Sequence, residues 1–248
     1  GRVGVLEEFR AVLADSALHY AKESASGSYA FYTRSINEQT LLKLSMESAL
    51  RKAVERDELI PYYQPKVSPD GKPVGAELLL RWRHPELGLL GPDKFICLAE
   101  ECNLIVPIGE WVIDAAARQL AAWQAAGRER LSLAINLSPL HFHHPRLLDV
   151  LRMARGRHGL TAGALEIELT EGMLMQDLDD TQVLLRELKK LGMRLAIDDF
   201  GTGYSSLSYL TRFPIDVLKI DRSFIRGIPE DVNQKNITRA IIALSHSL

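Results

Sequence analysis

The sequence predicts an α/β fold in which helices cover a mostly parallel sheet, and three observations support this prediction. Strand-like and helix-like segments alternate from residue 59 onward, which is typical of parallel strands joined by crossover helices. The strand-like runs are rich in apolar residues, as expected of strands covered on both faces. Several of these runs end in polar residues, which fits a barrel with its chemistry at the carboxyl ends of the strands.

Six segments of the sequence fit the strand pattern. The first two are joined by SPDGK, a hairpin-type turn signal, so they should pair antiparallel. Helical patterns separate the later segments, which should therefore run parallel to one another. The expected strands are residues 59–67, 73–82, 131–138, 164–170, 193–199 and 216–221.

Six strands are fewer than a closed barrel of this kind requires. An eight-stranded barrel takes about 250 residues, more than the segment that follows residue 59 provides. The last helical pattern, VNQKNITRAIIALSHSL, has no glycine cap and no following strand. Two interpretations stay open, a smaller open α/β sheet or a barrel whose last two strands are missing from this chain. We favour the second.

Composition narrows the classes of function. The formal net charge of −2 argues against a broad surface for a nucleic acid polymer or an anionic membrane. The longest apolar stretches are strand-sized, so we expect no transmembrane helix, no signal peptide and no membrane contact from this segment. Cys97 and Cys102 lie five residues apart in a helical segment and point to different faces. We therefore expect no disulfide and a cytoplasmic location.

Polar residues at the ends of the predicted strands form a second pattern. In a parallel barrel these ends converge on one rim, so the side chains should lie close together. Several carboxylates would then share one pocket, where their pKa values would be strongly raised unless a positive charge neutralised them. The strand-end residues are Glu77, Arg81, Asn136, Glu168, Glu171, Asp198, Asp199, Lys219 and Asp221.

Divalent cations would neutralise such a pocket. Oxygen ligands without histidine or cysteine favour Mg²⁺ or Mn²⁺ over Zn²⁺. The adjacent Asp198 and Asp199 can serve two ions about 3.5–4 Å apart, an arrangement suited to phosphoryl chemistry. Lys219 could orient a water molecule or stabilise negative charge, and Arg81 is a natural phosphate clamp.

Each of these residues also has an ordinary structural explanation. A strand-end Glu or Asp often caps the next helix, Lys219 alone fits a surface salt bridge, and Asn136 could shape a turn. The polar ends of several strands together favour a site, because capping does not require this coincidence. The histidines of HFHH, residues 141–144, are interpreted as surface or capping residues rather than as metal ligands.

Six motifs occur along the chain in a characteristic order: YYQPKV, GAELLLRWRHPELG, INLSP, IELTE, AIDDFGTGYSSLSYL and DVLKIDRSFI. Together they resemble the EAL-domain cyclic di-GMP phosphodiesterases, from about Met46 to the end of the chain. The triplet that names the family reads Glu77-Leu78-Leu79, with leucine in place of the middle alanine. The middle position is not a metal ligand in the family, so this change by itself casts little doubt on activity.

The resemblance implies a TIM-like (β/α)8 barrel whose first strand is antiparallel to the rest. It implies hydrolysis of cyclic di-GMP to linear pGpG with two Mg²⁺ or Mn²⁺ ions per site, inhibition by Ca²⁺, and a homodimer formed through this domain. Lys219 corresponds to the residue that contacts the hydrolytic water. Glu171 corresponds to the glutamate that holds the loop after the paired aspartates and links the metal site to the dimer interface. The family's metal ligands correspond to Glu77, Asn136, Glu168, Asp198 and Asp199, and its substrate contacts to Gln64, Leu79 and Arg81.

The same resemblance leaves a second function open. The family continues to a strand with a further catalytic glutamate, which these residues do not include, so we expect residues 1–248 alone to be poorly active and poorly soluble. The alternative to an enzyme is a catalytically inactive EAL domain that binds cyclic di-GMP as a receptor. Because every family ligand position within the chain is filled, we favour the enzyme.

The N-terminal residues resemble a different domain. LADSALHYAKESASGSYAFYT is similar to the last helix and strand of a GGDEF diguanylate cyclase domain. We therefore expect a GGDEF remnant over residues 1–34, a linker helix over 35–58 and the incomplete EAL barrel over 59–248. The parent protein is expected to be a tandem GGDEF–EAL protein.

Overall fold

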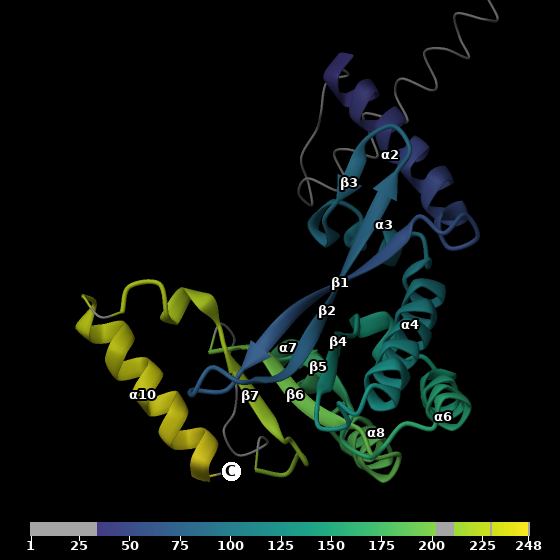
Figure 1. Ribbon diagram of the computed structural model, residues 1–248. Helices are drawn as coiled ribbons and strands as arrows, with labels where there is room; N and C mark the ends of the chain where they lie inside the picture. Colours follow the sequence, from purple (N-terminus) through teal and green to yellow (C-terminus); the bar gives the residue numbers. More distant parts are fainter. Residues whose placement is uncertain (1–33, 202–210, 229, 248) are drawn as a thin grey trace, which may run out of the picture.

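The computed structural model describes residues 34–201, 211–228 and 230–247, and its centre is a curled seven-stranded sheet (Figure 1). All six expected strands are present, and each begins at the expected residue or one residue later. The additional strand, β3, is three residues long and pairs with the end of β2. The strands are β1 (Leu59–Val67), β2 (Pro73–His84), β3 (Gly88–Leu90), β4 (Ser132–Asn136), β5 (Leu165–Thr170), β6 (Arg194–Phe200) and β7 (Val217–Ile220).

The strand order confirms the predicted topology. β1 pairs antiparallel with β2, whereas β2, β4, β5, β6 and β7 pair in parallel in that order. Gly75 permits the first parallel pairing, because a Cβ atom there would lie 2.3 Å from the carbonyl oxygen of Ser132. The result is the α/β, TIM-like arrangement with an antiparallel first strand. Among the described residues the sheet is open, with β1 and β7 at its edges.

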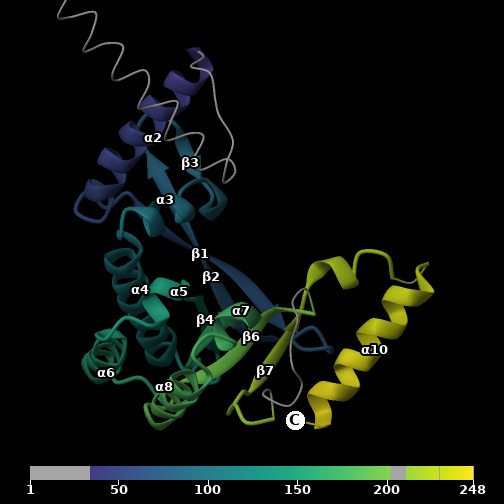
Figure 2. The ribbon, with the colours of Figure 1, turned by 180° about the vertical axis from the view of Figure 1, so that it is seen from behind.

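Helices cover the sheet on its outer side. In both views α4, α6 and α8 lie together on one side of the strands, and α10 lies beside β7 at the other end (Figures 1 and 2). None of the described helices is long and apolar enough to cross a membrane. The helices are α2 (Arg34–Ala53), η1 (Pro92–Lys94), α3 (Ile96–Glu101), α4 (Ile105–Ala125), α5 (Pro139–Phe142), α6 (Leu147–His158), α7 (Glu171–Leu174), α8 (Leu178–Lys190), η2 (Arg222–Phe224) and α10 (Val232–Ser247).

The described residues cover only part of the N-terminal region for which segments were predicted. The helix expected after residue 35 is present as α2, although it ends at Ala53, five residues before the expected boundary. The GGDEF remnant lies outside the described residues, except for Arg34, so the division into three segments stays a prediction. Cys97 and Cys102 are both free thiols, as expected.

Alternation along the strands separates an apolar face from a polar one. On β5 the residues Leu165, Ile167 and Leu169 are buried in the core formed with the helices. Successive strand residues point to opposite faces, so Glu166 and Glu168 face the interior of the curled sheet. The parallel register places Asn136 beside Glu168 on this inner face. The inner face therefore gathers the charged residues of several strands.

Candidate metal centre

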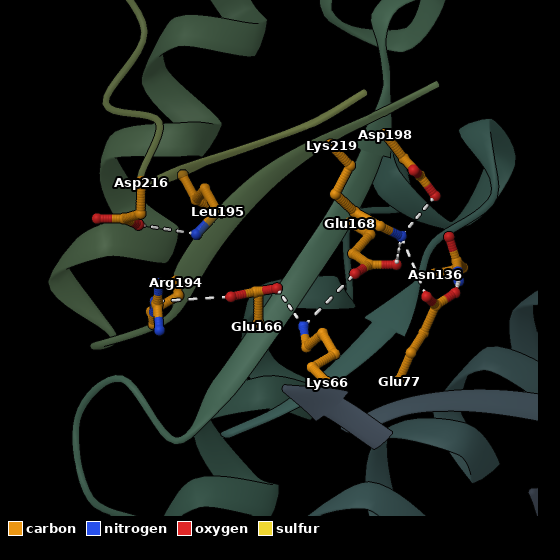
Figure 3. A network of polar contacts seen from close by, with 10 residues as sticks. All are labelled: Lys66, Glu77, Asn136, Glu166, Glu168, Arg194, Leu195, Asp198, Asp216 and Lys219. Carbon is orange, nitrogen blue, oxygen red and sulfur yellow. Dashed lines mark hydrogen bonds and ion pairs between the residues drawn. The ribbon is translucent and has the colours of Figure 1, made fainter. Parts of the chain in front are cut away.

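Three carboxylates from three different strands meet on the inner face of the sheet (Figure 3). Glu77 comes from β2, Glu168 from β5 and Asp198 from β6, and one ligand oxygen of each lies within 4.8 Å of the others. These strands are parallel, so their side chains approach the same rim. The predicted convergence of these three residues is confirmed. We call them the carboxylate cluster.

Lys219 on β7 lies at the centre of the carboxylate cluster. Its Nζ donates hydrogen bonds to Glu168 Oε2 at 2.7 Å, Asp198 Oδ2 at 3.0 Å and Glu77 Oε2 at 3.1 Å. Burial alone would lower the pKa of Lys219, but the hydrogen bonds and charges of Glu168 and Asp198 outweigh burial and raise it. Lys219 is therefore a fixed positive charge among the three acids.

The cluster carries more negative charge than one lysine neutralises. Glu168 is 1 % exposed, and burial raises its pKa to about 7, although Lys219 acts in the opposite direction. Burial also acts to raise the pKa of Glu77, but Lys219 and Asn136 outweigh it and lower that pKa. Two neighbouring glutamates thus have pKa values displaced in opposite directions, which is typical of acids that compete for one counter-charge.

The donor set fits a small divalent cation. Asn136 donates its amide Nδ2–H to Glu77 Oε1 at 2.8 Å, which leaves its carbonyl oxygen as the atom for a metal. Every candidate ligand atom is therefore an oxygen, the type that Mg²⁺ and Mn²⁺ prefer. In addition, Oε1 of the buried Glu168 makes no hydrogen bond within the described part of the chain.

Asp199 lies outside the carboxylate cluster. Its backbone has a left-handed φ of +52°, and its amide N–H donates to Asp198 Oδ1 at 3.0 Å. Burial raises the pKa of Asp199, and the negative charges of Asp198 and Asp221 raise it further. Asp199 thus lies close to both Asp198 and Asp221, the residue that follows β7, and is not one of the three clustered acids. Its role as a ligand of the second metal stays a prediction.

Asp221 is a neighbour that the sequence analysis noted as a strand-end carboxylate but assigned no role. Its Oδ1 accepts from the backbone N–H of Ser223 at 2.9 Å, and the hydrogen bonds from Ser223 lower its pKa. Its position at a strand end, which identified the other acids of the site, was the available signal for assigning Asp221 to the site as well.

The predicted substrate residues lie on the β1–β2 hairpin beside the cluster. Gln64 is opposite Glu77 in the antiparallel register. The Arg81 guanidinium lies over the ring of Tyr62, 5.4 Å from its centroid. Leu79 lines a cavity of about 460 Å³ that also reaches Asn136. Their role as substrate contacts stays a prediction.

Glu171 connects the site to the following loop. It is the first residue of α7, it is 5 % exposed, and its Oε2 accepts from the backbone N–H of Gly201 at 3.3 Å. Gly201 has a φ of +100°, which favours glycine. Residues 202–210, which follow Gly201 in the sequence, lie outside the described residues.

The interpretation of the histidine run is wrong for His141. This side chain is 1 % exposed, and burial lowers its pKa to about 4. It packs against Gly109 of α4, where a Cβ atom would lie 2.1 Å from His141 Nδ1. His144 makes a local hydrogen bond, in which its Nδ1 accepts from the backbone N–H of Arg146 at 3.3 Å.

The sequence analysis missed two charged residues on the inner face, Lys66 and Glu166. Lys66 Nζ donates to Glu166 Oε1 at 2.6 Å and lies 3.8 Å from Glu168 Oε1. Lys66 shares its strand face with Gln64, and Glu166 shares its face with Glu168, so alternation along β1 and β5 was the available signal.

The fold and the site define a TIM-like barrel protein with an acidic, lysine-bridged centre at the carboxyl ends of its parallel strands. The chain belongs to the EAL domain family, whose model matches residues 47–248.

Two of the curated relatives that the chain matches come from Pseudomonas aeruginosa. The bifunctional diguanylate cyclase/cyclic di-GMP phosphodiesterase MucR is 45 % identical over 236 residues, covering 95 % of this chain and 34 % of MucR. The cyclic di-GMP phosphodiesterase NbdA is 44 % identical over 233 residues, covering 94 % of this chain and 30 % of NbdA. The chain thus spans about a third of the length of these relatives.

Solved structures agree with this family membership. The MucR phosphodiesterase in complex with cyclic di-GMP matches with a TM-score of 0.79 and 46 % identity, over 82 % of this chain and 83 % of that one. The FimX EAL domain from Pseudomonas aeruginosa, bound to cyclic di-GMP, matches with a TM-score of 0.73 and 26 % identity, over 81 % and 80 % of the two chains.

Proposed function

We propose that this chain hydrolyses one phosphodiester bond of cyclic di-GMP and releases linear pGpG, using two Mg²⁺ or Mn²⁺ ions. The observation that carries the proposal is the carboxylate cluster, whose ligand atoms lie within 4.8 Å of one another. The names of MucR and NbdA and the solved MucR complex support the choice of substrate.

The chain's own residues divide into metal ligands and substrate contacts. When bound, the ions supply an activated water and polarise a phosphate oxygen. Asp199 is assigned to the second ion, with Asp221 beside it. The ligands assigned to the first ion are Glu77, Asn136, Glu168 and Asp198.

Lys219 and the hairpin residues act on the reacting groups. The three N–H groups of Lys219 donate to three acids. When metal ions neutralise these acids, a released N–H can donate to a water molecule and stabilise negative charge that develops on the phosphate. Arg81 binds a phosphate, and its contact with Tyr62 holds the guanidinium at the rim. Gln64 adds an amide contact, and Leu79 offers an apolar surface to a base.

Glu171 is assigned to the loop rather than to the chemistry. Its carboxylate holds the amide of Gly201, directly after the two aspartates. We propose that this contact couples the metal site to a homodimer interface, as in the family. Light scattering of the complete protein with and without cyclic di-GMP measures the dimer, and a monomer under both conditions contradicts it.

One observation favours a second candidate function, a receptor that binds cyclic di-GMP without cleaving it. Lys219 partly neutralises the carboxylate cluster by itself. The three acids can therefore stay together, and cyclic di-GMP can bind, in a protein that holds no metal. The enzyme is preferred because all the ligand positions in the described chain are filled.

The deciding experiment incubates the complete protein with cyclic di-GMP and Mn²⁺ and separates the products by chromatography. Accumulation of pGpG that stops on addition of EDTA supports the phosphodiesterase. Saturable binding of cyclic di-GMP with no pGpG, in both Mg²⁺ and Mn²⁺, establishes the receptor instead.

A further inference from the structure

A line of alternating charges runs behind the carboxylate cluster (Figure 3). Arg194 Nε lies 3.6 Å from Glu166 Oε2, and Lys66 Nζ donates to Glu166 Oε1 at 2.6 Å. The same Lys66 Nζ lies 3.8 Å from Glu168 Oε1. The line therefore ends at Glu168 Oε1. The other oxygen of the same carboxylate, Oε2, contacts Lys219 in the carboxylate cluster.

The two oxygens of Glu168 have different partners. Oε2 accepts from Lys219 at 2.7 Å on the side of the carboxylate cluster. Oε1 faces Lys66 on the opposite side and makes no hydrogen bond within the described residues. Because the Glu168 side chain is fully buried, no bulk water competes with these two lysines for its orientation.

Lys66 is itself held in place. It extends from β1 across the interior to β5, a strand that is not its neighbour in the sheet. Its hydrogen bond goes to Glu166, which is also buried and in turn contacts Arg194. Lys66 thus has a fixed position from which it attracts the rear oxygen of Glu168.

An orientation of this kind affects the choice of metal. A carboxylate whose rear oxygen is held back presents one oxygen to an ion. Mg²⁺ demands near-ideal octahedral geometry with six ligands, whereas Ca²⁺ takes six to eight oxygens at longer distances and often binds carboxylates through both oxygens. A glutamate restricted to one oxygen therefore disfavours Ca²⁺ relative to the smaller ions.

We propose that Lys66, anchored by Glu166, is a positioning residue that keeps Glu168 a one-oxygen ligand and so sets the preference of the site for Mn²⁺ or Mg²⁺ over Ca²⁺. This inference rests on the proposed function, because Glu168 is a metal ligand only there.

The test compares dissociation constants for two ions in the complete protein. Mn²⁺ binding is followed by electron paramagnetic resonance, and Ca²⁺ binding by its competition with Mn²⁺. The principal variant is the double change Lys66→Met/Glu166→Gln, which removes the pair without leaving a buried charge alone. Lys66→Arg keeps the charge, and Lys72→Met is the matched control, since Lys72 is an exposed lysine that pairs with Asp70 in the hairpin turn.

We expect the ratio of the Ca²⁺ to the Mn²⁺ dissociation constant to fall about tenfold in the double variant, the scale on which partners of metal ligands act. The single variant Lys66→Arg should keep the ratio within about threefold of the wild type, and Lys72→Met should leave it unchanged. If the double variant does not fold, the isosteric Glu166→Gln, which removes the anchor alone, should lower the ratio in the same direction.

Two results overturn the inference alone, given a wild-type protein that binds Mn²⁺. One is an unchanged ratio in a folded double variant, and the other is a Lys66→Arg variant whose ratio falls as far as that of the double variant. A wild-type protein that binds no Mn²⁺ overturns the proposed function and this inference with it.

Discussion

Lys219 donates its shortest hydrogen bond within the carboxylate cluster, 2.7 Å, to the fully buried Glu168. A buried carboxylate without a positive partner is strongly unfavourable. The same lysine is assigned to catalysis, so a residue of the reaction also stabilises the metal-free fold.

Replacing this lysine should therefore destabilise the metal-free protein. In Lys219→Met we expect the free energy of unfolding in EDTA to fall by about 3 kcal/mol, because three acids lose their shared partner. Chemical denaturation measures the loss, and Mn²⁺ should restore part of it. Lys190→Met, which removes an exposed lysine on α8, is the control. Equal stability of Lys219→Met and wild type in EDTA would show that Lys219 does not neutralise the cluster.

Asp198→Asn should abolish turnover and leave the fold intact. The change keeps the shape of the side chain but removes a charge that the metal requires. Replacing a residue that only contacts a metal ligand typically lowers metal affinity or activity about 10- to 100-fold. Loss of a ligand itself should therefore reduce the rate by at least about 100-fold. Production of pGpG measures the rate, and circular dichroism monitors the fold. Asp70→Asn in the exposed hairpin turn is the matched control. Wild-type turnover in Asp198→Asn would mean that the metal site lies elsewhere.

The raised pKa of Glu168 makes stability depend on pH. The folded protein holds this proton up to about pH 7, whereas the unfolded chain releases it near the usual pKa of 4.5. The native state thus binds more protons in this window, so the contribution of Glu168 is present below about pH 4.5 and is lost as pH rises to about 7. In EDTA, Glu168→Gln should gain stability relative to wild type as pH rises from 5 to 8. A constant difference in unfolding free energy across that range would contradict the raised pKa.

Gly109→Ala should destabilise the protein through His141. The new methyl group would overlap the buried ring, and overpacking of this kind costs about 1–3 kcal/mol. If the clash is the cause, the double variant Gly109→Ala/His141→Ala should be more stable than the sum of the two single losses predicts. Gly156→Ala on α6, where a Cβ atom meets nothing within 4 Å, is the control. Additive losses would exclude this contact as the cause.

The strands and the carboxylate cluster could be predicted from the sequence because both depend on local patterns. Apolar runs bounded by turns identified the strands, and residues at strand ends identified Glu77, Glu168 and Asp198. The parallel arrangement then brings distant residues to one rim without further information.

What could not be predicted depends on contacts between distant segments. The burial of His141 requires a glycine on α4, thirty-two residues earlier in the chain, to make room for its ring. The contact of Lys66 with Glu166 requires the sheet to curl so far that β1 faces β5. Asp199 has a left-handed backbone and is not one of the three clustered acids, although it directly follows Asp198 in the sequence.

The reversed first strand has a practical consequence. Because β1 runs antiparallel to β2, the turn that joins them lies at the amino-terminal end of the parallel strands, on the opposite side of the sheet from the carboxylate cluster. Residues 69–72 of this turn are exposed, and a tight hydrogen-bonded turn at Ser68 and Gly71 closes the hairpin. An exposed loop tip of this kind tolerates insertions. A short epitope or a fluorescent reporter inserted there would label the protein at a distance from the residues assigned to metal and substrate.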